Sequence, residues 1–174
     1  MNEKKIEESK TIMNELIMPN DANPLGNLMG GNLLRWMDIA GGICASKHSE
    51  AITVTASVDH VSFSAPIKVG NVIKITSVIT RAFRTSMEVY IEVHVTDITG
   101  NNTMKSNHAY MTFVALDQDT KKPILVPKFK PVSVEEIKRY ESATRRREVR
   151  LILSGRLQAK DATDLREFFD HLEN

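Results

Sequence analysis

Asn23-Pro-Leu-Gly-Asn-Leu-Met-Gly30-Gly31 is a glycine-rich turn that leads directly into a segment with helical spacing of apolar residues. The apolar set recurs at three- and four-residue intervals: Leu33, Leu34, Trp36, Met37, Ala40, Ile43 and Cys44. We predict one long buried helix from residue 30 to about residue 48, although the internal Gly41–Gly42 pair weakens the prediction for its last turns. Asp38 lies in the middle of this apolar set, and a buried carboxylate is costly unless it is paired or used.

Strand patterns lie on both sides of this helix. One covers residues 11–18, and four follow the helix at 52–63, 71–80, 87–95 and 103–116. In the third of these four, Val89, Ile91, Val93 and Val95 alternate with Glu88, Tyr90, Glu92 and His94. One helix combined with antiparallel strands predicts an α+β domain whose apolar sheet face is covered by the helix. Since one helix cannot shield the sheet edge, we expect that edge to pair with a second copy of the chain.

The composition changes after Pro131, so we divide the chain into a domain at 1–130 and a helical tail at 131–174. The tail predicts a basic helix at 133–153, a break at Ser154-Gly155 and a short amphipathic helix at 161–172. We expect this tail to serve packing or subunit assembly rather than catalysis.

The overall composition excludes several classes of protein. The 174 residues include 23 basic and 22 acidic side chains, so charge indicates neither a nucleic-acid nor a membrane partner. No run of 18 apolar residues occurs, and the charged N-terminal stretch is not a signal peptide, so we expect a cytoplasmic protein. A single cysteine excludes an internal disulfide. The five histidines, at 48, 60, 94, 108 and 171, show no metal-ligand spacing, so we predict no metal.

The turn and the helix start suggest a site for chemistry on a carbonyl group. A free N–H at Gly30, at the positive end of the helix dipole, suits an oxygen that gains negative charge. Asp38 would be the base or nucleophile, but eight helical residues span about 12 Å. Either the two groups serve different purposes, or two helices meet antiparallel across a twofold axis and the site is shared between chains. The alternative is structural: Asp38 would cap a loop or pair with Arg35, and the glycines and Asn23 would simply form a turn.

The pattern Asn-x-x-Gly-x-x-x-Gly-Gly, with Asp38 eight residues after Gly30, resembles the hotdog-fold acyl-CoA thioesterases of the YciA and brain acyl-CoA hydrolase type. Val58-Asp-His-Val-Ser-Phe-Ser-Ala-Pro-Ile-Lys-Val-Gly70 resembles the same family's second strand and following turn. The resemblance implies a hotdog fold, in which an antiparallel sheet wraps one long central helix. It also implies homodimers assembled into a trimer of dimers, and hydrolysis of acyl-CoA to free acid and CoA without a separate cofactor.

The same resemblance implies roles for individual residues. Asn23, Asp38 and Gly30 match the catalytic asparagine, the catalytic aspartate and the glycine whose N–H polarises the carbonyl; the aspartate either attacks directly or activates water. Asn23 would offer a donor and an acceptor. A second set concerns substrate binding, with Thr55 and Ser57 flanking the place where relatives carry a helper serine: Gly31, Thr55, Ser57, Arg81, Arg84 and Ser86.

Several assignments have alternatives at this point. Arg81, Arg84 and Ser86 either hold the CoA phosphates or form a solvated hairpin tip, and the arginines at 145–147 and 150 either join them or line a solvated helix face. The acyl pocket would take side chains such as Trp36, Met37 and Phe63. As whole functions, a non-catalytic acyl-CoA sensor and a hydroxyacyl dehydratase stay open, although the latter relies on a histidine base near the helix and none lies between Asn23 and Lys47.

Overall fold

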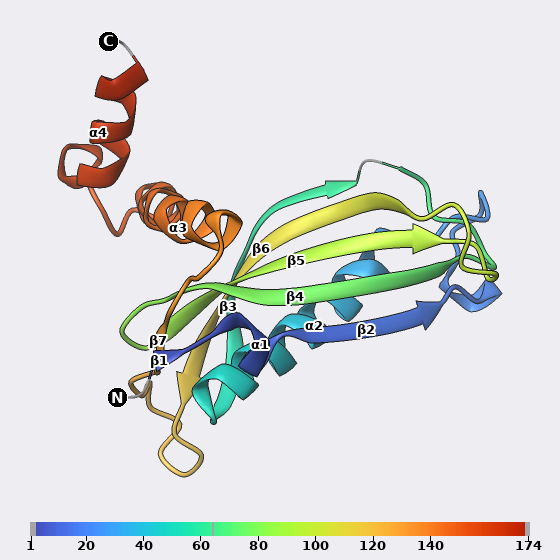
Figure 1. Ribbon diagram of the computed structural model, residues 1–174, viewed down its shortest axis with the longest axis horizontal. Coiled ribbons are helices and arrows are strands. Elements are labelled where there is room, and N and C mark those ends of the chain that lie inside the picture. The colour runs from blue at the N-terminus through green and yellow to red at the C-terminus, as the bar shows by residue number, and fades with distance from the viewer. Residues whose placement is uncertain (1–2, 64, 173–174) are drawn as a thin grey trace. The chain divides into compact units, whose positions relative to one another are not determined.

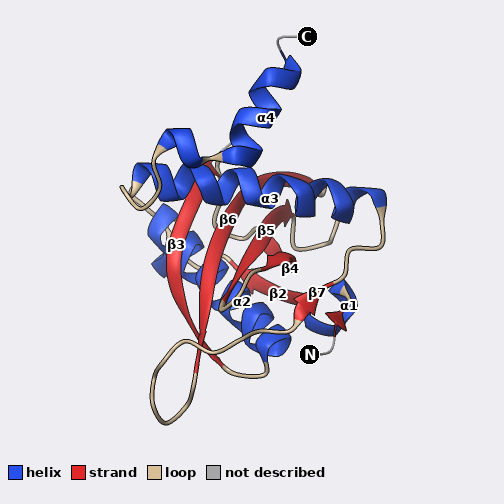
Figure 2. Cartoon of the chain, turned by 90° about the vertical axis from the view of Figure 1, so that its left-hand side faces the viewer, coloured by secondary structure: helices blue, strands red, loops and turns tan. Residues whose placement is uncertain are grey.

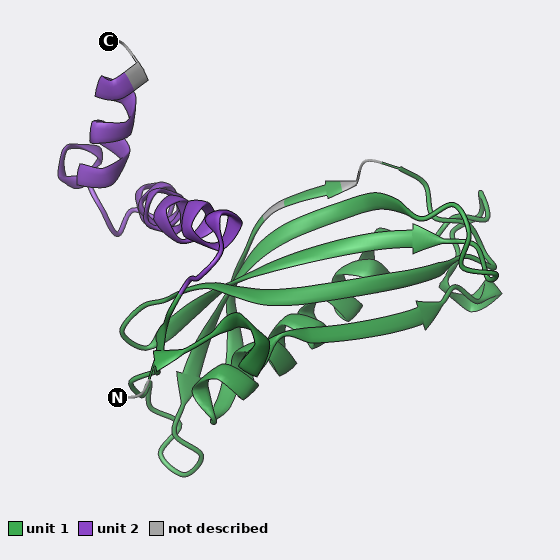
Figure 3. Ribbon diagram, in the orientation of Figure 1, with its two compact units in different colours: residues 1–130 green, residues 131–174 purple. Residues whose placement is uncertain are grey.

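The computed structural model describes residues 3–63 and 65–172. The chain divides into two compact units, residues 1–130 and 131–174, and each is described by itself (Figure 3). The elements of the first unit, in chain order, are β1 (Glu3–Lys4), α1 (Ile6–Ser9), β2 (Thr11–Leu16), the 3-10 turn η1 (Pro19–Asp21), α2 (Gly30–Ser49), β3 (Ile52–Phe63), β4 (Val72–Ala82), β5 (Ser86–Thr96), β6 (Met104–Leu116) and β7 (Lys128–Phe129).

The main sheet of the described residues has five antiparallel strands in the order β2-β4-β5-β6-β3 (Figure 1). The sheet curves around α2, as Figures 1 and 2 show together. The predicted face of β5 is confirmed, because Val89, Ile91 and Val93 are fully buried. The opposite face of β5 is less exposed than the alternation predicts. Glu88 on this face is also buried, and its carboxylate accepts a hydrogen bond of 2.6 Å from Thr80 Oγ1.

Helix α2 begins at Gly30 and continues through the Gly41–Gly42 pair to Ser49, as predicted. The pair has a packing reason. A Cβ on Gly41 would lie 2.9 Å from Ile91 Cδ1 and from the Phe113 ring, so the helix approaches the sheet more closely than a side chain permits. The predicted place of Cys44 in the core is confirmed, and burial raises the pKa of its thiol to about 12.

Three short elements and one shortened strand differ from the prediction. Strand β2 ends at Leu16, two residues before the predicted end. The sequence did not predict α1 or the parallel pair β1–β7, because two paired residues carry no periodicity. This second small sheet lies at the C-terminal end of α2, where the buried ring of His48 bonds through Nε2 to Pro127 O at 2.9 Å.

The second unit consists of α3 (Val134–Leu153), the 3-10 turn η2 (Ala159–Asp161) and α4 (Thr163–Leu172). Ser133 caps the start of α3 by accepting from Glu136 N, and the chain turns at Gly155, whose φ is +71°. The buried Glu148 of α3 accepts hydrogen bonds from the first backbone N–H groups of α4, those of Asp164 and Leu165. The carboxylate of Glu148 therefore links the two helices, because the N-terminal end of a helix favours a negative charge.

The first unit has the predicted α+β architecture. A curled antiparallel sheet around one long helix is the hotdog fold that the resemblance implied. In the part of the chain that is described, none of the helices combines the length and the apolar character that crossing a membrane requires.

Candidate active site

The start of α2 offers free hydrogen-bond donors. Gly30 and Gly31 occupy the first two helical positions, and the preceding residue, Met29, provides no side-chain cap. The first N–H groups of a helix have no partner inside the helix. In the described residues, no other group accepts from the N–H of Gly30 or Gly31, whereas Met29 N is held by Asp21 O at 2.9 Å. Two N–H groups thus remain available at the positive end of a 20-residue helix.

Asn23 lies in the tight turn that precedes this helix start. Its Oδ1 accepts from Leu25 N at 2.9 Å and from Asn27 N at 3.2 Å, and Gly26 closes the turn with a φ of +75°. The side-chain oxygen is therefore used by the turn itself. The Nδ2 group has no acceptor within the described residues. Asn23 consequently offers a donor alone, in contrast to the donor and acceptor that the sequence led us to expect.

A pocket of about 290 Å³ lies between this turn, the helix start and the loop that follows β3. Asn23 and Gly30, two of the candidate residues, both border this pocket. The loop is held to the turn by backbone hydrogen bonds, Leu28 N to Ile67 O at 2.7 Å and Val69 N to Gly26 O at 3.3 Å. The pocket walls are thus fixed by main-chain contacts rather than by side chains alone.

Asp38 lies outside this pocket, in the middle of α2 and half-buried. Thr55 Oγ1 on β3 donates to Asp38 Oδ1 at 2.5 Å. Within the described residues Asp38 forms no ion pair, so the expected alternative of a pair with Arg35 does not occur. Ser57, the other candidate hydroxyl, bonds instead to Asp59 at 3.4 Å. A bulge between Thr55 and Ser57 shifts the alternation of side chains along β3, and the two hydroxyls have different partners.

The surface around Asp38 is an uncovered apolar edge. β3 is the last strand of the sheet, and Val54 and Val58 on it are nearly half exposed. Ile39 and Ile43 of α2 are exposed to a similar degree. An edge strand with exposed aliphatic side chains is a surface that natural proteins pair or cover.

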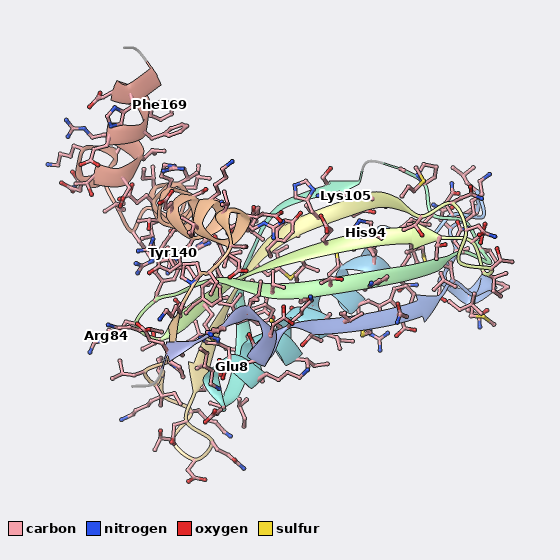
Figure 4. All side chains as sticks on the ribbon, in the orientation of Figure 1. Glu8, Arg84, His94, Lys105, Tyr140 and Phe169 are labelled. Carbon is pink, nitrogen blue, oxygen red and sulfur yellow. The ribbon has the colours of Figure 1, made fainter. Side chains whose placement is uncertain are left out.

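The predicted phosphate-binding residues lie elsewhere. Arg81, Arg84 and Ser86 flank the β4–β5 hairpin, and Figure 4 shows Arg84 at the end of the sheet away from the β2 and β5 arrowheads, near which α2 begins. Arg84 O accepts from Val126 N, next to the Pro127 that bonds His48 near the end of α2. Within one chain, therefore, the hairpin and the Asn23–Gly30 pocket lie at opposite ends of the helix.

The sequence reading missed part of the pocket wall. Asn27, Asn107 and the loop residues Ala65, Pro66 and Ile67 border the pocket, whereas Trp36 and Met37 are buried in the core away from it. Asn107 could have been found from the alternation of side chains along β6. Ala109, Met111 and Phe113 share one face of this strand, and residue 107 lies on the same face. The side chains of Phe63 and His60, which the sequence analysis also considered, lie outside the described residues. No three His, Cys, Asp or Glu side chains of the described chain come together as a metal site.

These features define a class of protein: a hotdog domain with free N–H groups at the start of its central helix and a carboxylate on the same helix. The family model described as "Thioesterase superfamily" matches residues 25–100. The chain is 37% identical over 144 residues to protein VdlD of Helicobacter pylori, covering 83% of this chain and 82% of VdlD. It is 35% identical to the uncharacterized acyl-CoA thioester hydrolase YkhA of Bacillus subtilis, covering 80% of each.

Solved structures agree with these relatives. An apo-hexameric acyl-CoA thioesterase superposes with a TM-score of 0.85 at 34% identity, covering 88% of this chain and 98% of the other. The acyl-CoA hydrolase of Staphylococcus aureus, solved with butyryl-CoA, CoA and CoA disulfide, gives a TM-score of 0.80 at 33% identity over 98% and 99% of the two chains. The chain belongs to the thioesterase superfamily, and within it to the acyl-CoA thioesterases of the hotdog fold.

Proposed function

We propose that this protein hydrolyses acyl-CoA thioesters to the free acid and CoA in a site shared by two copies of the chain. The Gly30 N–H, with Gly31 beside it, polarises the thioester carbonyl, Asn23 Nδ2 donates to the substrate or to the attacking water, and Asp38 of the second copy is the base or nucleophile. One observation carries this proposal: Asn23 and Gly30, whose donors are free, border a pocket that Asp38 of the same chain does not border.

Two routes use this arrangement equally well. In the first, Asp38 takes a proton from water, the water oxygen bonds to the carbonyl carbon, and the carbon–sulfur bond breaks to release the CoA thiolate, which recovers the proton. In the second, an Asp38 oxygen bonds to the carbonyl carbon and expels the thiolate, and water then hydrolyses the resulting anhydride. In both, the oxyanion forms at the Gly30 N–H, and such a donor contributes about 3–4 kcal/mol to the transition state.

The spacing of three side chains supports this assignment. Three of the similar structures are variants of the Staphylococcus aureus acyl-CoA hydrolase in which one aspartate, one asparagine or one threonine is replaced by alanine. There the aspartate follows the asparagine by fifteen positions, and the threonine follows the aspartate by seventeen. Positions 23, 38 and 55 repeat both spacings with Asn, Asp and Thr. We therefore reassign Thr55 from substrate binding to the positioning of Asp38, and we give Ser57 no direct role on Asp38.

The exposed edge supports a dimer. Pairing of β3 with β3 of a second copy would cover Val54 and Val58, and antiparallel packing of the two α2 helices would cover Ile39 and Ile43. Such packing brings Asp38 of one copy toward Gly30 of the other. The hexameric state of the similar thioesterase supports assembly into a hexamer. We propose that this hexamer consists of three such dimers and that residues 131–174 contribute contacts between subunits.

The β4–β5 hairpin is assigned to the CoA phosphates in this arrangement. The hairpin lies on the C-terminal side of Asp38 along α2. With the acyl group in the pocket of the second copy, the CoA part of the substrate would extend along α2 in this direction. Arg81 and Arg84 offer guanidinium groups there and Ser86 a hydroxyl, which suit phosphate oxygens. Replacement of Arg84 by alanine should raise KM with little change in kcat.

Mixing two inactive variants tests the shared site. Asn23→Ala and Asp38→Ala chains, co-expressed with different tags, form mixed dimers in which one of the two sites has both native residues. Random assembly places half of the dimers in this class, so thiol release from acyl-CoA should recover to about one quarter of the wild-type rate. Each variant alone is the control. Failure of the mixture to exceed the single variants, with mixed dimers demonstrated by tag capture, would contradict a site built from two chains.

A further inference from the structure

We propose that the pocket beside Asn23 and Gly30 receives the acyl group and limits the enzyme to short, uncharged acyl chains, with Ala65 and Ile67 setting the length. This inference rests on the proposed function, because it takes the carbonyl to lie at the Gly30 N–H. It adds what the proposed mechanism leaves open, namely which acyl groups fit.

The composition of the pocket wall is the first argument. Leu28, Leu33, Ala65, Pro66 and Ile67 form its apolar part, and the polar part consists of neutral groups of Asn23, Asn27, Gly30 and Asn107. A pocket that is mainly apolar with a few directed polar groups is typical of a small-molecule site. The donors lie on the side where the carbonyl would bind, and the aliphatic side chains can cover the remainder of an alkyl chain.

The absence of charge is the second argument. No Asp, Glu, Lys, Arg or His lines the pocket among the residues that the structure describes. A dicarboxylic acyl group, such as succinyl, would bring a carboxylate into this space without a cation to pair with, and an unpaired charge is expensive to desolvate. For the same reason the pocket does not suit the phosphates of CoA. The pocket therefore favours uncharged acyl groups.

The volume is the third argument. A pocket of about 290 Å³ is just below the usual range for drug-sized ligands. One water molecule occupies about 30 Å³ in the liquid, so at a similar volume for each heavy atom the pocket holds roughly ten, which is an acyl chain of up to about eight carbons with room for packing. Chains that are longer must displace protein or remain in solvent.

Substitutions at two residues of the same loop should change the acyl-chain length that the pocket accepts, in opposite directions. Ile67 is buried and borders the pocket, so Ile67→Ala removes three carbons from the wall. Ala65 is half-buried on the same wall, so Ala65→Leu adds three carbons to it. Val69, four residues after Ala65, is partly exposed and does not border the pocket, which makes Val69→Ala the matched control.

The experiment measures kcat/KM of the full-length protein for acetyl-, butyryl-, hexanoyl-, octanoyl-, decanoyl- and succinyl-CoA. Each methylene that enters the pocket should raise kcat/KM about fourfold until the space is filled. We expect a maximum at or below octanoyl in the wild type, a maximum at least two carbons longer in Ile67→Ala, and one at least two carbons shorter in Ala65→Leu. Val69→Ala should keep the wild-type profile, and succinyl-CoA should react at least 100-fold more slowly than butyryl-CoA.

Binding of acyl-CoA thioethers, which cannot be hydrolysed, is measured on the same proteins by calorimetry. This measurement separates the two proposals. If no thioester releases a thiol, the proposed function is contradicted. The chain-length dependence of thioether binding still tests whether the pocket receives the acyl group. If Ile67→Ala does not fold, Ala65→Leu decides alone. The pocket assignment is overturned if Ala65→Leu leaves the chain-length profile of binding unchanged, or if the succinyl thioether binds as tightly as the butyryl one.

Discussion

Thr55 Oγ1 lies 2.5 Å from Asp38 Oδ1, so the hydroxyl of an edge strand holds one oxygen of the carboxylate on the central helix. A threonine hydroxyl has a single proton to donate, and it is directed at this oxygen. The other carboxylate oxygen has no hydrogen-bond partner among the described residues. The contact therefore restrains the carboxylate and leaves one oxygen for the role that we propose for Asp38.

The first prediction concerns this contact. A hydrogen bond to a charged acceptor contributes about 1.5–3 kcal/mol, so Thr55→Ala should lower kcat by roughly 10- to 100-fold. Thr55→Ser keeps the hydroxyl and should lie within a few-fold of wild type. The melting temperature of each variant is measured as well, so that a loss of kcat is separated from a loss of stability. Equal kcat values for the alanine and serine variants would show that the hydroxyl does not position Asp38.

The second prediction concerns the paired glycines of α2. A Cβ at residue 41 meets Ile91 and the fully buried Phe113 ring at 2.9 Å, so Gly41→Ala should destabilise the fold by about 1–3 kcal/mol. At residue 42 the nearest atom is 3.7 Å away, so Gly42→Ala should stabilise by up to about 1 kcal/mol through helix propensity. Denaturation midpoints in urea measure both, and shifts of the same sign would contradict the close approach of helix and sheet.

The third prediction concerns pH. Burial, helped by the nearby charge of Lys4, lowers the pKa of His48 below its ordinary value of 6.5, although the Pro127 carbonyl and Glu8 oppose the shift. The unfolded chain then binds the proton more readily than the folded one, so the His48 contribution to stability is complete above about pH 6.5 and is lost as the pH falls below it. Protonation would also leave the Nδ1 proton unpaired, since Nδ1 has no partner in the described structure.

Thermal unfolding of wild type and His48→Gln between pH 5 and pH 8 measures this effect. The variant cannot gain a proton at this position, so the advantage of the wild type in melting temperature should shrink as the pH falls. Other titrating groups are common to both proteins and cancel in the difference. A difference that is constant across the range would show that residue 48 does not titrate with folding.

The fourth prediction concerns the second unit. Ser133 Oγ accepts from Glu136 N at 3.2 Å, and the Glu136 carboxylate in turn accepts from Val132 N at 2.9 Å. Ser133→Ala removes this cap and should cost about 1 kcal/mol in the stability of α3, seen as faster hydrogen exchange in its first turns. Ser142→Ala, in the middle of the same helix, should be neutral or slightly stabilising because alanine has the higher helix propensity. Equal effects of the two changes would argue against the cap.

Much of the fold could be predicted because its periodicity is strong. The strand at 52–63 has the bounds that its composition indicated, and α2 ends one residue beyond its predicted end. The strand order, which places β3 at an exposed edge, does not follow from periodicity. Elements stabilised by a few long-range contacts could not be predicted, as the two-residue pair β1–β7 shows, since two residues define no period.

The candidate site was predictable in its parts and not in its assembly. Asn23, Gly30 and Asp38 stand out by residue type and spacing, but the pocket also needs Asn107, which comes from a strand 77 positions beyond Gly30. The contact from Thr55 rather than Ser57 depends on the bulge at residue 56, and a bulge shifts the side-chain alternation that sequence patterns rely on. Local periodicity fixes which face a residue occupies within an element, whereas such contacts depend on how distant elements meet.

The burial of Cys44 matters for an enzyme that releases a thiol at every turnover. CoA thiol and its disulfide exchange with protein thiolates, and the rate depends on access and on the fraction of thiolate. The buried thiol of this α2 residue, with a pKa of about 12, is almost entirely protonated at neutral pH. With no other cysteine in the sequence, the folded protein should resist covalent capture by its own product, even as CoA accumulates and oxidises around it.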